Sequence, residues 1–525
     1  MTPDGGHLAV LADWTDRVKN GELPARSPQR PVGVERNLVV TVRDWLDPKH
    51  YLHDLSTTDR RKPTVNGYGP IYGDTELSSS EQPVLDPVKN LKWTITPPVR
   101  PGTPGSELAN EVVNPSPYWG MEQVWNSRVN AHTSVMDQDG RVYWAAQNRP
   151  PNEIPDYCKK GSPLRSAQLY PLNTPHDGFF QNSRQVTVYD PKTQKYTMID
   201  TCFGTHHLNF AEDANNTLWL SNNTGRGGAP GEELAVAGWI NTKLLWRTGD
   251  QAKAQGWTPF IVDTNANGKR DEDWNEPDQQ PDYSKDTRLP FGIYGIAWTP
   301  ADKVIWGSNL THPGYIIRLD PGKNPPETAI AEIYKVPLPG FGIRGMDVDR
   351  NGIVWMPLDS GHLASFDRRK CKGPLNGPGA EKGDKCPEGF SFYALPGPGF
   401  QGDPGAEENP YYVWVDWFNI LGLGANVPFE TGNQSDSLYA LVGGQFVELR
   451  VPYPMGFFAK GLEGRIDDPK AGSKGRELWA TSGNRTPFHI EGIDAPAPGA
   501  PGATPETLSS PLVVEFQLRP DPLAH

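Results

Sequence analysis

A hairpin pattern of thirteen residues recurs along the chain and restricts the fold more than any other feature of the sequence. Four copies align without gaps: HTSVMDQDGRVYW from His132, HLNFAEDANNTLW from His207, YGIAWTPADKVIW from Tyr294 and RGMDVDRNGIVWM from Arg344. Each copy has a short alternating apolar run, a polar turn, and a second apolar run that ends in an aromatic residue or Met. This order of elements is typical of a β-hairpin.

Two further strands follow each hairpin. The third closes on an Asp-Pro turn in QVTVYDPK, YIIRLDP and PVLDPV, and HLASFDRR takes its place in another copy. A fourth strand comes next, as in KYTMID or FSFYALP. Each unit is therefore a four-stranded meander, which cannot bury both faces alone. Radial packing of several units solves this problem, and it predicts a β-propeller.

The sequence predicts an all-β, seven-bladed β-propeller of four-stranded antiparallel blades with long loop insertions. The expected units are 33–100, 117–203, 205–264, 288–336, 340–397, 408–454 and 456–520. A long insertion, DPKHYLHDLSTTDRRKPTVNGYG, interrupts the first unit, and the sixth departs furthest from the pattern, so six or eight blades are alternatives. Residues 1–32 are expected to form a short helix and a Pro-rich arm, and 33–525 a single propeller domain.

Charge and hydropathy exclude several classes of partner. The formal net charge is −13 and no cluster of Lys and Arg stands out, whereas nucleic acid and anionic membranes both require a concentrated cationic patch. No stretch approaches eighteen apolar residues, so we expect no membrane insertion.

Four cysteines form two pairs that are local in sequence, Cys158 with Cys202 and Cys371 with Cys386. An even count with local pairing favours two disulfides over metal thiolates. We therefore expect a periplasmic or secreted protein. Because MTPDGGHLAVLADW lacks the features of a leader, we expect a leader or a larger region upstream of this sequence.

The hairpin pattern, with a Gly-containing turn and a closing Trp, resembles the repeat of virginiamycin B (streptogramin) lyases and related NHL-like propellers. The resemblance covers four units and extends to a fifth, KGLEGRIDDPKAGSKGRELW. It implies a propeller of a group that includes lyases, lactonases and binding scaffolds. In the lyases, a His acts as base beside an acidic residue and Mg²⁺ in a β-elimination.

Two positions in each unit are expected to meet at one mouth of the central channel. The start of the first strand and the third residue after the closing aromatic residue or Met should lie at the same face of a propeller. The first set is His132, His207, Tyr294, Arg344 and Lys460; the second is Gln147, Asn222, Asn309, Asp359 and Ser482. Neither set contains an aliphatic residue, and polar groups in an enclosed funnel need partners such as a ligand, a metal or water.

These residues support a lyase-like elimination, or a ring or ester opening, on a small molecule. His132 or His207 would act as general base, and Arg344, with Lys460 or Tyr294, would hold a carboxylate or an oxyanion. Asp359 matches the acidic partner, and Mg²⁺ or another divalent metal would bind at the funnel. The remaining four, Gln147, Asn222, Asn309 and Ser482, would contact the substrate.

Three alternatives stand beside this hypothesis. The histidines could bind a transition metal, together with His312, His362 or His489, in a metal-dependent oxidase. A lactonase is a further possibility, and it differs from the oxidase in whether carboxylate and amide oxygens or imidazoles hold the metal. His206 is expected to point away from such a site, because neighbours in a strand face opposite sides. The funnel residues could also bond only to one another and to water, in a binding propeller that works with a partner protein or an upstream module. The aromatic runs at 411–418 and 457–458 are expected to pack between blades rather than line a pocket.

The segment DTNANGKRDEDWNEPD, which begins at Asp263, resembles a calcium-binding loop. Oxygen ligands are expected from Asp263, Asn265, Asn267, the Lys269 carbonyl and Asp271 around Gly268. Trp274 occupies the position that normally carries a bidentate Glu, so Asp273 or Glu276 is expected to complete the site. The ion would be structural, and an acidic turn without an ion is the alternative.

Overall fold

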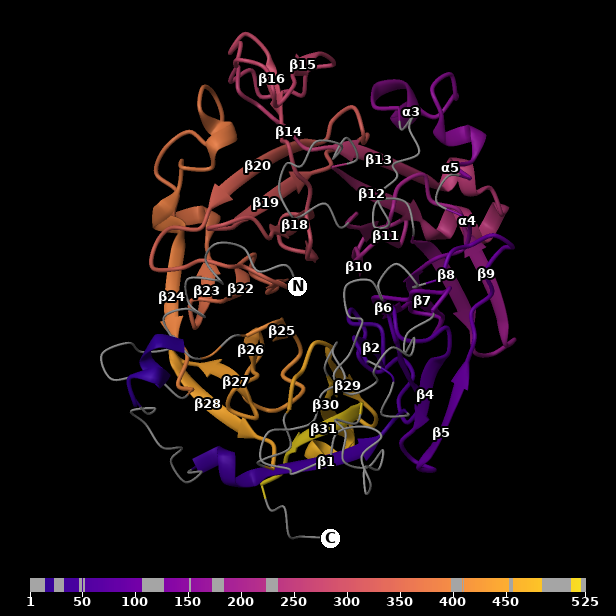
Figure 1. Cartoon of the computed structure of the whole chain (residues 1–525), viewed down its shortest axis with the longest axis vertical. Helices are drawn as coiled ribbons and strands as arrows, with labels where there is room; N and C mark the ends of the chain where they lie inside the picture. Colours follow the sequence, from indigo (N-terminus) through magenta and orange to yellow (C-terminus); the bar gives the residue numbers. More distant parts are fainter. Residues whose placement is uncertain are drawn as a thin grey trace.

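The repeated hairpins fold into sheets that stand around a common axis, with their short first strands innermost (Figure 1). In the computed structural model the strands form seven sheets, six of four strands and one of seven. The protein is therefore an all-β propeller, as the sequence predicted. The structure describes residues 15–22, 33–46, 50, 52–105, 127–150, 153–171, 184–222, 235–397, 408, 410–452, 457–483 and 511–520.

Each sheet is named here by its innermost strand. Three sheets precede the acidic loop: β2 (Leu55–Ser56), β3 (Ile71–Gly73), β4 (Gln82–Asp86) and β5 (Leu91–Ile95); β6 (Ser134–Met136), β7 (Val142–Ala146), β8 (Gln185–Asp190) and β9 (Lys195–Ile199); β10 (Leu208–Phe210), β11 (Thr217–Leu220), β12 (Val236–Asn241) and β13 (Gln255–Pro259).

Three more follow it: β17 (Ile296–Thr299), β18 (Val304–Asn309), β19 (Tyr315–Asp320) and β20 (Ile330–Lys335); β21 (Asp347–Val348), β22 (Val354–Leu358), β23 (His362–Phe366) and β24 (Phe390–Ala394); β25 (Val413–Asp416), β26 (Val427–Gly432), β27 (Ser437–Val442) and β28 (Gln445–Arg450). The last sheet consists of β29 (Leu462–Ile466), β30 (Arg476–Ser482), β31 (Leu512–Leu518) and β1 (Leu38–Asp44).

The β17 sheet departs from the expected four antiparallel strands. Three short strands, β14 (Ile261–Val262), β15 (Trp274–Asn275) and β16 (Asp286–Arg288), extend its outer edge, and β14 runs parallel to β20. The acidic loop is thus built onto the sheet, and it projects from the rim of the propeller (Figure 1).

Helical segments lie in the connections and are short: η1 (Gly33–Asn37), η2 (Asp156–Cys158), α3 (Arg165–Leu169), α4 (Thr242–Thr248), α5 (Gln251–Ala254), η3 (Arg368–Lys370), η4 (Ala380–Lys382), η5 (Pro387–Gly389) and η6 (Gly472–Gly475). Residues 15–19 are also helical, but most of the expected N-terminal arm lies outside the described residues. Within the described residues, no helix combines the length and the apolar content that crossing a membrane requires.

The hairpin turns explain why the Asp and Gly of the pattern recur. The carboxylate of Asp137 accepts hydrogen bonds from the main-chain N–H groups of Asp139 and Arg141, at 2.9 and 3.0 Å. Asp349 holds its own turn in the same way. Gly140 has a φ of 84°, a left-handed conformation that glycine adopts without a steric cost. The turn therefore fixes the register of the two inner strands.

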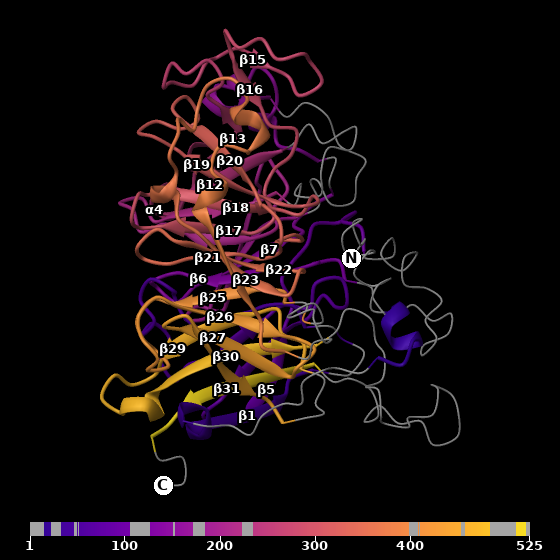
Figure 2. The same ribbon diagram turned by 90° about the vertical axis from the view of Figure 1, so that its left-hand side faces the viewer.

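The prediction that the first unit spans residues 33–100 is wrong. Strand β1 does not open the first sheet; it pairs antiparallel with β31 from Leu38 opposite Leu518 to Asp44 opposite Leu512. Arg43 and Glu515 form an ion pair across this pairing at 2.9 Å. The two ends of the described chain thus share one sheet, which closes the ring (Figures 1 and 2).

The segment interpreted as an insertion in the first unit contains the innermost strand of that sheet. Strand β2 is only two residues long, and it pairs with β3 through Leu55 and Ser56. Such a short strand gives no alternating pattern, so the sequence did not reveal it.

Hydrophobic clusters bridge neighbouring sheets and hold them side by side. Trp306 of β18 packs against Phe366 of β23 with ring centroids 5.7 Å apart, and both side chains are buried. Tyr143 of β7 similarly meets Phe210 of β10 at 5.2 Å. Aromatic residues therefore form much of the packing between sheets, where they contribute both area and edge-to-face contacts.

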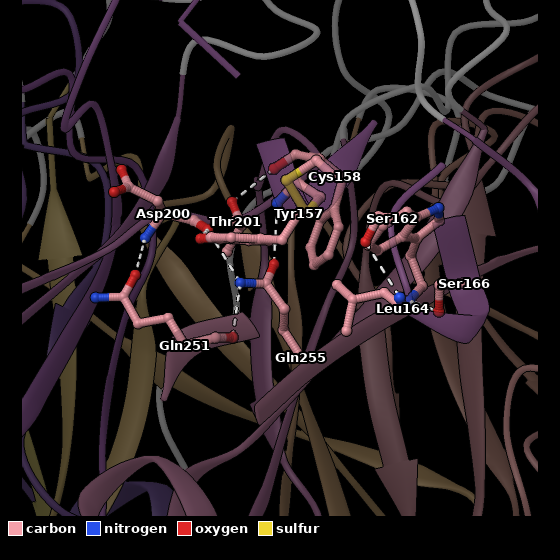
Figure 3. The surroundings of a disulfide bond; sticks show 12 residues. Tyr157, Cys158, Ser162, Leu164, Ser166, Asp200, Thr201, Gln251 and Gln255 are labelled. Carbon is pink, nitrogen blue, oxygen red and sulfur yellow. Dashed lines mark hydrogen bonds between the residues drawn. A yellow bond between two sulfur atoms is a disulfide. The ribbon is translucent and has the colours of Figure 1, made fainter. Parts of the chain in front are cut away.

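Both expected disulfides are confirmed, Cys158 with Cys202 and Cys371 with Cys386. Figure 3 shows the hydrogen bonds around the first: Cys202 donates its N–H to Gln255, whose amide donates to the carbonyl of Asp200. Tyr157 donates its hydroxyl to the same carbonyl at 2.7 Å. The disulfide thus ties the 153–171 loop to the segment between β9 and β10, and Cys202 is itself bonded to Gln255, the first residue of β13.

We predict that removing the two disulfides separately will destabilise the protein by different amounts. Cys158 and Cys202 are 44 residues apart, whereas Cys371 and Cys386 are 15 apart. On loop-closure entropy, replacing the first pair by Ala should lower the free energy of unfolding by about 4 kcal/mol and the second by about 3 kcal/mol. Urea unfolding measures both. Variants as stable as the oxidised protein would contradict a structural role for the bridges.

Candidate metal and substrate site

Three imidazoles meet on the axis where the β6 and β10 sheets begin. His132 stacks on His206 with ring centroids 3.9 Å apart, and His207 lies 4.3 Å from His206 and 5.3 Å from His132. One nitrogen of each ring lies within 4.8 Å of the other two. All three side chains are buried. We call these residues the three-histidine cluster.

The expectation that His206 points away from this cluster is wrong. His206 and His207 come directly before β10 and do not alternate as strand residues do. The N–H of His206 bonds to the carbonyl of Ser221, and the N–H of His207 bonds to the hydroxyl of the same Ser221. Two successive residues thus face one residue of the partner strand, as in a β-bulge, and both rings reach the axis.

A second group adjoins the cluster through His132. The ring of His53 lies 3.9 Å from that of His132, and Nδ1 of His132 lies 3.1 Å from a carboxylate oxygen of Glu76. Arg184 lies 3.3 Å from the same oxygen of Glu76. His53, Glu76 and His132 also have ligand atoms within 4.8 Å of one another. Glu76 is therefore placed to orient His132 and is itself neutralised by Arg184.

The environment keeps the imidazoles of His206 and His207 uncharged. Burial lowers the pKa of both His206 and His207 well below the ordinary value, and the nearby His132 lowers it further. Neutral imidazole is the form that binds a metal, and also the form that accepts a proton.

Tyrosines, an arginine and a lysine surround one side of the cluster. The hydroxyl of Tyr412 lies 3.0 Å from Nε2 of His207, and the hydroxyls of Tyr294 and Tyr411 are 3.2 Å apart. The guanidinium carbon of Arg344 lies 4.8 Å from the ring of Tyr411, and Nζ of Lys460 lies 4.9 Å from it. The structure thus brings together all five first-strand residues that the sequence selected.

Arg344 keeps its charge in this buried position. Burial alone would lower its pKa, but the neighbouring Tyr411, Tyr294 and Asp359 outweigh this effect, so the pKa of Arg344 is raised. Asp359 is the acidic residue expected near the funnel, and it is buried as well. A guanidinium with aromatic faces around it suits a carboxylate or another planar anion.

The second-strand set is mainly bonded to main-chain groups. Gln147 donates to the carbonyls of Pro104 and Arg128, and Asn309 donates to that of Gly292. Ser482 accepts the N–H of Phe458. Asn222 is buried. These contacts hold the loops above the second strands, and the substrate-binding role predicted for these residues stays a prediction.

Other histidines are not gathered here. His312 packs against Phe341 at 5.8 Å, and Nδ1 of His362 lies 3.3 Å from the hydroxyl of Ser360. Among the described residues, neither belongs to a group with metal-ligand geometry. His489 lies outside the described residues.

The acidic loop has the turn that a calcium-binding loop requires. The carboxylate of Asp263 accepts the N–H groups of Asn267 and Gly268, and the side chain of Asn267 accepts the N–H of Lys269. Asn265 and Asn267 both donate to Asp271. The residues predicted to bind calcium therefore gather in one turn, with the amide nitrogens of Asn265 and Asn267 toward Asp271.

The residue that closes this loop differs from the expectation. Asp273 pairs with Lys285, and Glu276 pairs with Arg288. Asp286 instead adjoins Asp271: one carboxylate oxygen accepts the N–H of Asp271, while the other is buried without a hydrogen-bond partner among the described residues. Asp286 is thus the better candidate for the closing carboxylate, and its position fifteen residues after Asp271 hid it from the loop pattern.

Partly buried carboxyl groups line the channel next to the histidines. Asp54 donates its N–H to a carboxylate oxygen of Asp74, and Glu463 accepts bonds from the N–H and hydroxyl of Thr57 and the N–H of Thr58. Burial raises the pKa of Asp54 to about 8 and that of Glu463 to about 7.

No family model matches the sequence, and no curated protein matches it. Among solved structures, the chain is similar in fold to virginiamycin B lyase from Staphylococcus aureus, with 9% identity, 92% of this chain and 99% of that chain covered, and a TM-score of 0.46. A streptogramin B lyase is 9% identical, with 93% of this chain and 100% of that chain covered and a TM-score of 0.46. The calcium-binding protein regucalcin from Agrobacterium tumefaciens is 10% identical, with 91% of this chain and 95% of that chain covered and a TM-score of 0.33. Such similarity concerns the fold alone.

Glu463 predicts a pH dependence of stability. Its pKa in the folded protein, about 7, exceeds the ordinary 4.5, so its protonated form stabilises the fold below pH 4.5 and this contribution is lost as the pH rises to 7. Between pH 4.5 and pH 7 the free energy of unfolding of the wild type should therefore fall by up to about 3 kcal/mol through Glu463, and Glu463→Gln should abolish this fall. Urea unfolding at several pH values tests this. Parallel pH curves for the wild type and the variant would contradict the shift.

Proposed function

We propose that this chain is a seven-bladed propeller enzyme that uses a histidine-bound divalent transition metal to act on a small anionic molecule at the axis. In this proposal each of the seven sheets is one blade, including the extended β17 sheet. The observation that carries it is the three-histidine cluster, whose buried imidazoles have ligand atoms within 4.8 Å of one another and include the neutral rings of His206 and His207.

The donor set suits zinc, copper, iron or nickel better than Mg²⁺. Imidazole nitrogen is a preferred ligand of these metals, whereas Mg²⁺ prefers oxygen ligands. Nδ1 of His206 is buried without a hydrogen-bond partner among the described residues, and Tyr412 engages Nε2 of His207, so a metal would take Nδ1 of both rings. Glu76 at Nδ1 of His132 matches the carboxylates that orient metal-bound histidines through their other nitrogen.

Three protein ligands leave a coordination position open, as in catalytic metal sites. A metal held there supplies Lewis-acid chemistry or activates oxygen or water. The surrounding side chains would bind and orient the substrate: Arg344 and Lys460 hold its anionic group, and the hydroxyls of Tyr294 and Tyr412 donate hydrogen bonds to developing negative charge. Oxidation and ring or ester opening are the reaction classes that this arrangement serves.

A metal-free lyase is a second candidate. The hydrogen bond between His207 and Tyr412, together with the lowered pKa of His207, supports a neutral histidine that removes a proton in an elimination.

A binding propeller that works with a partner protein or an upstream module is a third candidate function. It is supported by the closure of one end of the channel by Arg60 and Arg61.

A structural calcium ion in the acidic loop belongs to the same proposal. Asp263, Asn265, Asn267, the Lys269 carbonyl and Asp271 supply the ligands, and Asp286 replaces Asp273 and Glu276 as the closing carboxylate. The loop also packs on the loop framed by Cys371 and Cys386, because Asn376 donates to Asp263 at 2.9 Å. Two disulfides and a calcium ion are both suited to a periplasmic or secreted protein.

We predict that the purified protein binds one equivalent of a transition metal through the cluster. His132→Ala and His206→Ala should each lower the metal content at least tenfold, because loss of a ligand leaves two imidazoles. His362→Ala, a histidine outside the cluster, is the control and should retain the metal. Elemental analysis by mass spectrometry gives the answer. Metal contents equal in all three variants, or a wild type that binds no added zinc, copper, iron or nickel, would refute the metal site.

We predict a separate effect of calcium on stability. Asp263→Ala should lower the melting temperature of the protein by several degrees in millimolar Ca²⁺ and much less in chelator, because binding to the folded state is lost. Asp286→Asn should have the same calcium-dependent effect, and Asp273→Asn should not. Differential scanning calorimetry measures all three. An equal effect of Asp263→Ala in calcium and in chelator contradicts the ion.

A further inference from the structure

A cavity of about 150 Å³ lies on the propeller axis beside the three-histidine cluster. Its walls come from the innermost strand of every sheet, from Leu55 of β2 to Leu462 of β29. The wall is mixed. Val135, Met136, Leu208, Phe210, Ile296 and Met346 contribute apolar surface, and Thr133, Ser134 and Asn209 place polar groups among them. The cavity is therefore separate from the second-strand loops in which the sequence placed the substrate-binding residues.

Side chains from the segment after β2 close one end of this cavity. Arg60 forms a two-pronged ion pair with Asp347 and lies over the ring of Trp417, 4.1 Å from its centre. Arg61 pairs with Asp59 and lies over the ring of Phe210 at 4.5 Å. Arg60 and Arg61 are thus each paired with a carboxylate and an aromatic ring. We therefore expect neither guanidinium group to bind a charged ligand at this end.

The other end of the cavity is polar and reaches the cluster. Asp54, His207, Tyr412 and Lys460 line it. Burial raises the pKa of Asp54 to about 8, so this carboxyl group is mostly uncharged near pH 7 and can donate a hydrogen bond. Lys460 supplies a buried ammonium group.

The size of the cavity limits the ligand to one ring. A cavity of about 150 Å³ is large enough to take up a molecule of the size of benzene. A second ring or a long side chain would not fit, whereas a single hydroxyl or similar small group would meet the hydrogen-bonding residues at the polar end.

We propose that the axial cavity binds a single-ring phenol, with the ring among the first strands and the hydroxyl group toward Lys460, Asp54 and Tyr412. The ring would lie on apolar side chains, and the hydroxyl would exchange hydrogen bonds with a cation and two polar groups. This inference deepens the proposed function, because it places a phenolic oxygen next to His207 of the cluster. It rests on the proposed function only for the statement that the phenol is a substrate.

Binding of 4-fluorophenol, followed by ¹⁹F NMR and calorimetry, tests the cavity directly. The wild type should bind one equivalent in a saturable manner. Val135→Phe should weaken binding at least tenfold, because the larger side chain occupies the cavity. Val88→Phe is the matched control at a valine that is 64% exposed, and it should bind as the wild type does. If Val135→Phe does not fold, Val135→Leu against Val88→Leu should still weaken binding measurably.

Absence of saturable binding to the wild type, or equal binding by the Val135 and Val88 variants, would overturn the proposal. Metal content is measured on the same samples. A protein that binds the phenol but no metal keeps the cavity site and loses the metal proposal, and a protein that binds metal but no phenol does the reverse.

Discussion

The pairing of β1 with β31 is the interaction on which the rest of the structure depends. It joins segments more than four hundred residues apart, Leu38 with Leu518, in one sheet and so closes the ring. Because the ring is closed, the innermost strands of all seven sheets face a common axis. Residues that begin those strands are then neighbours, although His132 and Lys460 are more than three hundred residues apart along the chain. The candidate site exists only in the closed arrangement.

The axis concentrates polar groups at an energetic cost. Neighbouring buried imidazoles and carboxyl groups lose their hydration, and the structure accommodates this by keeping many of them uncharged: the pKa of His206 and His207 is lowered, and that of Asp54 and Glu463 is raised. Apolar side chains of similar volume would fill the same space without this penalty. Groups of buried residues with shifted pKa values are typical of functional sites, and this cost supports the proposed metal.

The sequence predicted the features that a short pattern marks directly. The hairpin turns at Asp137 and Asp349 and the grouping of His132, His207, Tyr294, Arg344 and Lys460 follow from the repeated hairpin, and the two disulfides follow from an even number of cysteines in two local pairs. The sequence did not predict contacts that leave no such pattern, or irregular strands. The β1–β31 pairing leaves no local signal, and the two-residue β2 concealed His53. Strand alternation predicted the wrong direction for His206, because a bulge precedes β10. Tyr411 and Tyr412 were assigned to packing, since nothing in their run distinguishes a buried hydroxyl with a histidine partner from a core aromatic.

X-ray absorption spectroscopy at the metal edge of the purified protein tests the central claim most directly. The account predicts a first shell of about three nitrogen ligands at about 2.0–2.1 Å, with the outer-shell scattering of imidazole rings, if zinc occupies the site. A first shell made only of oxygen ligands, or a spectrum without imidazole scattering, would contradict it.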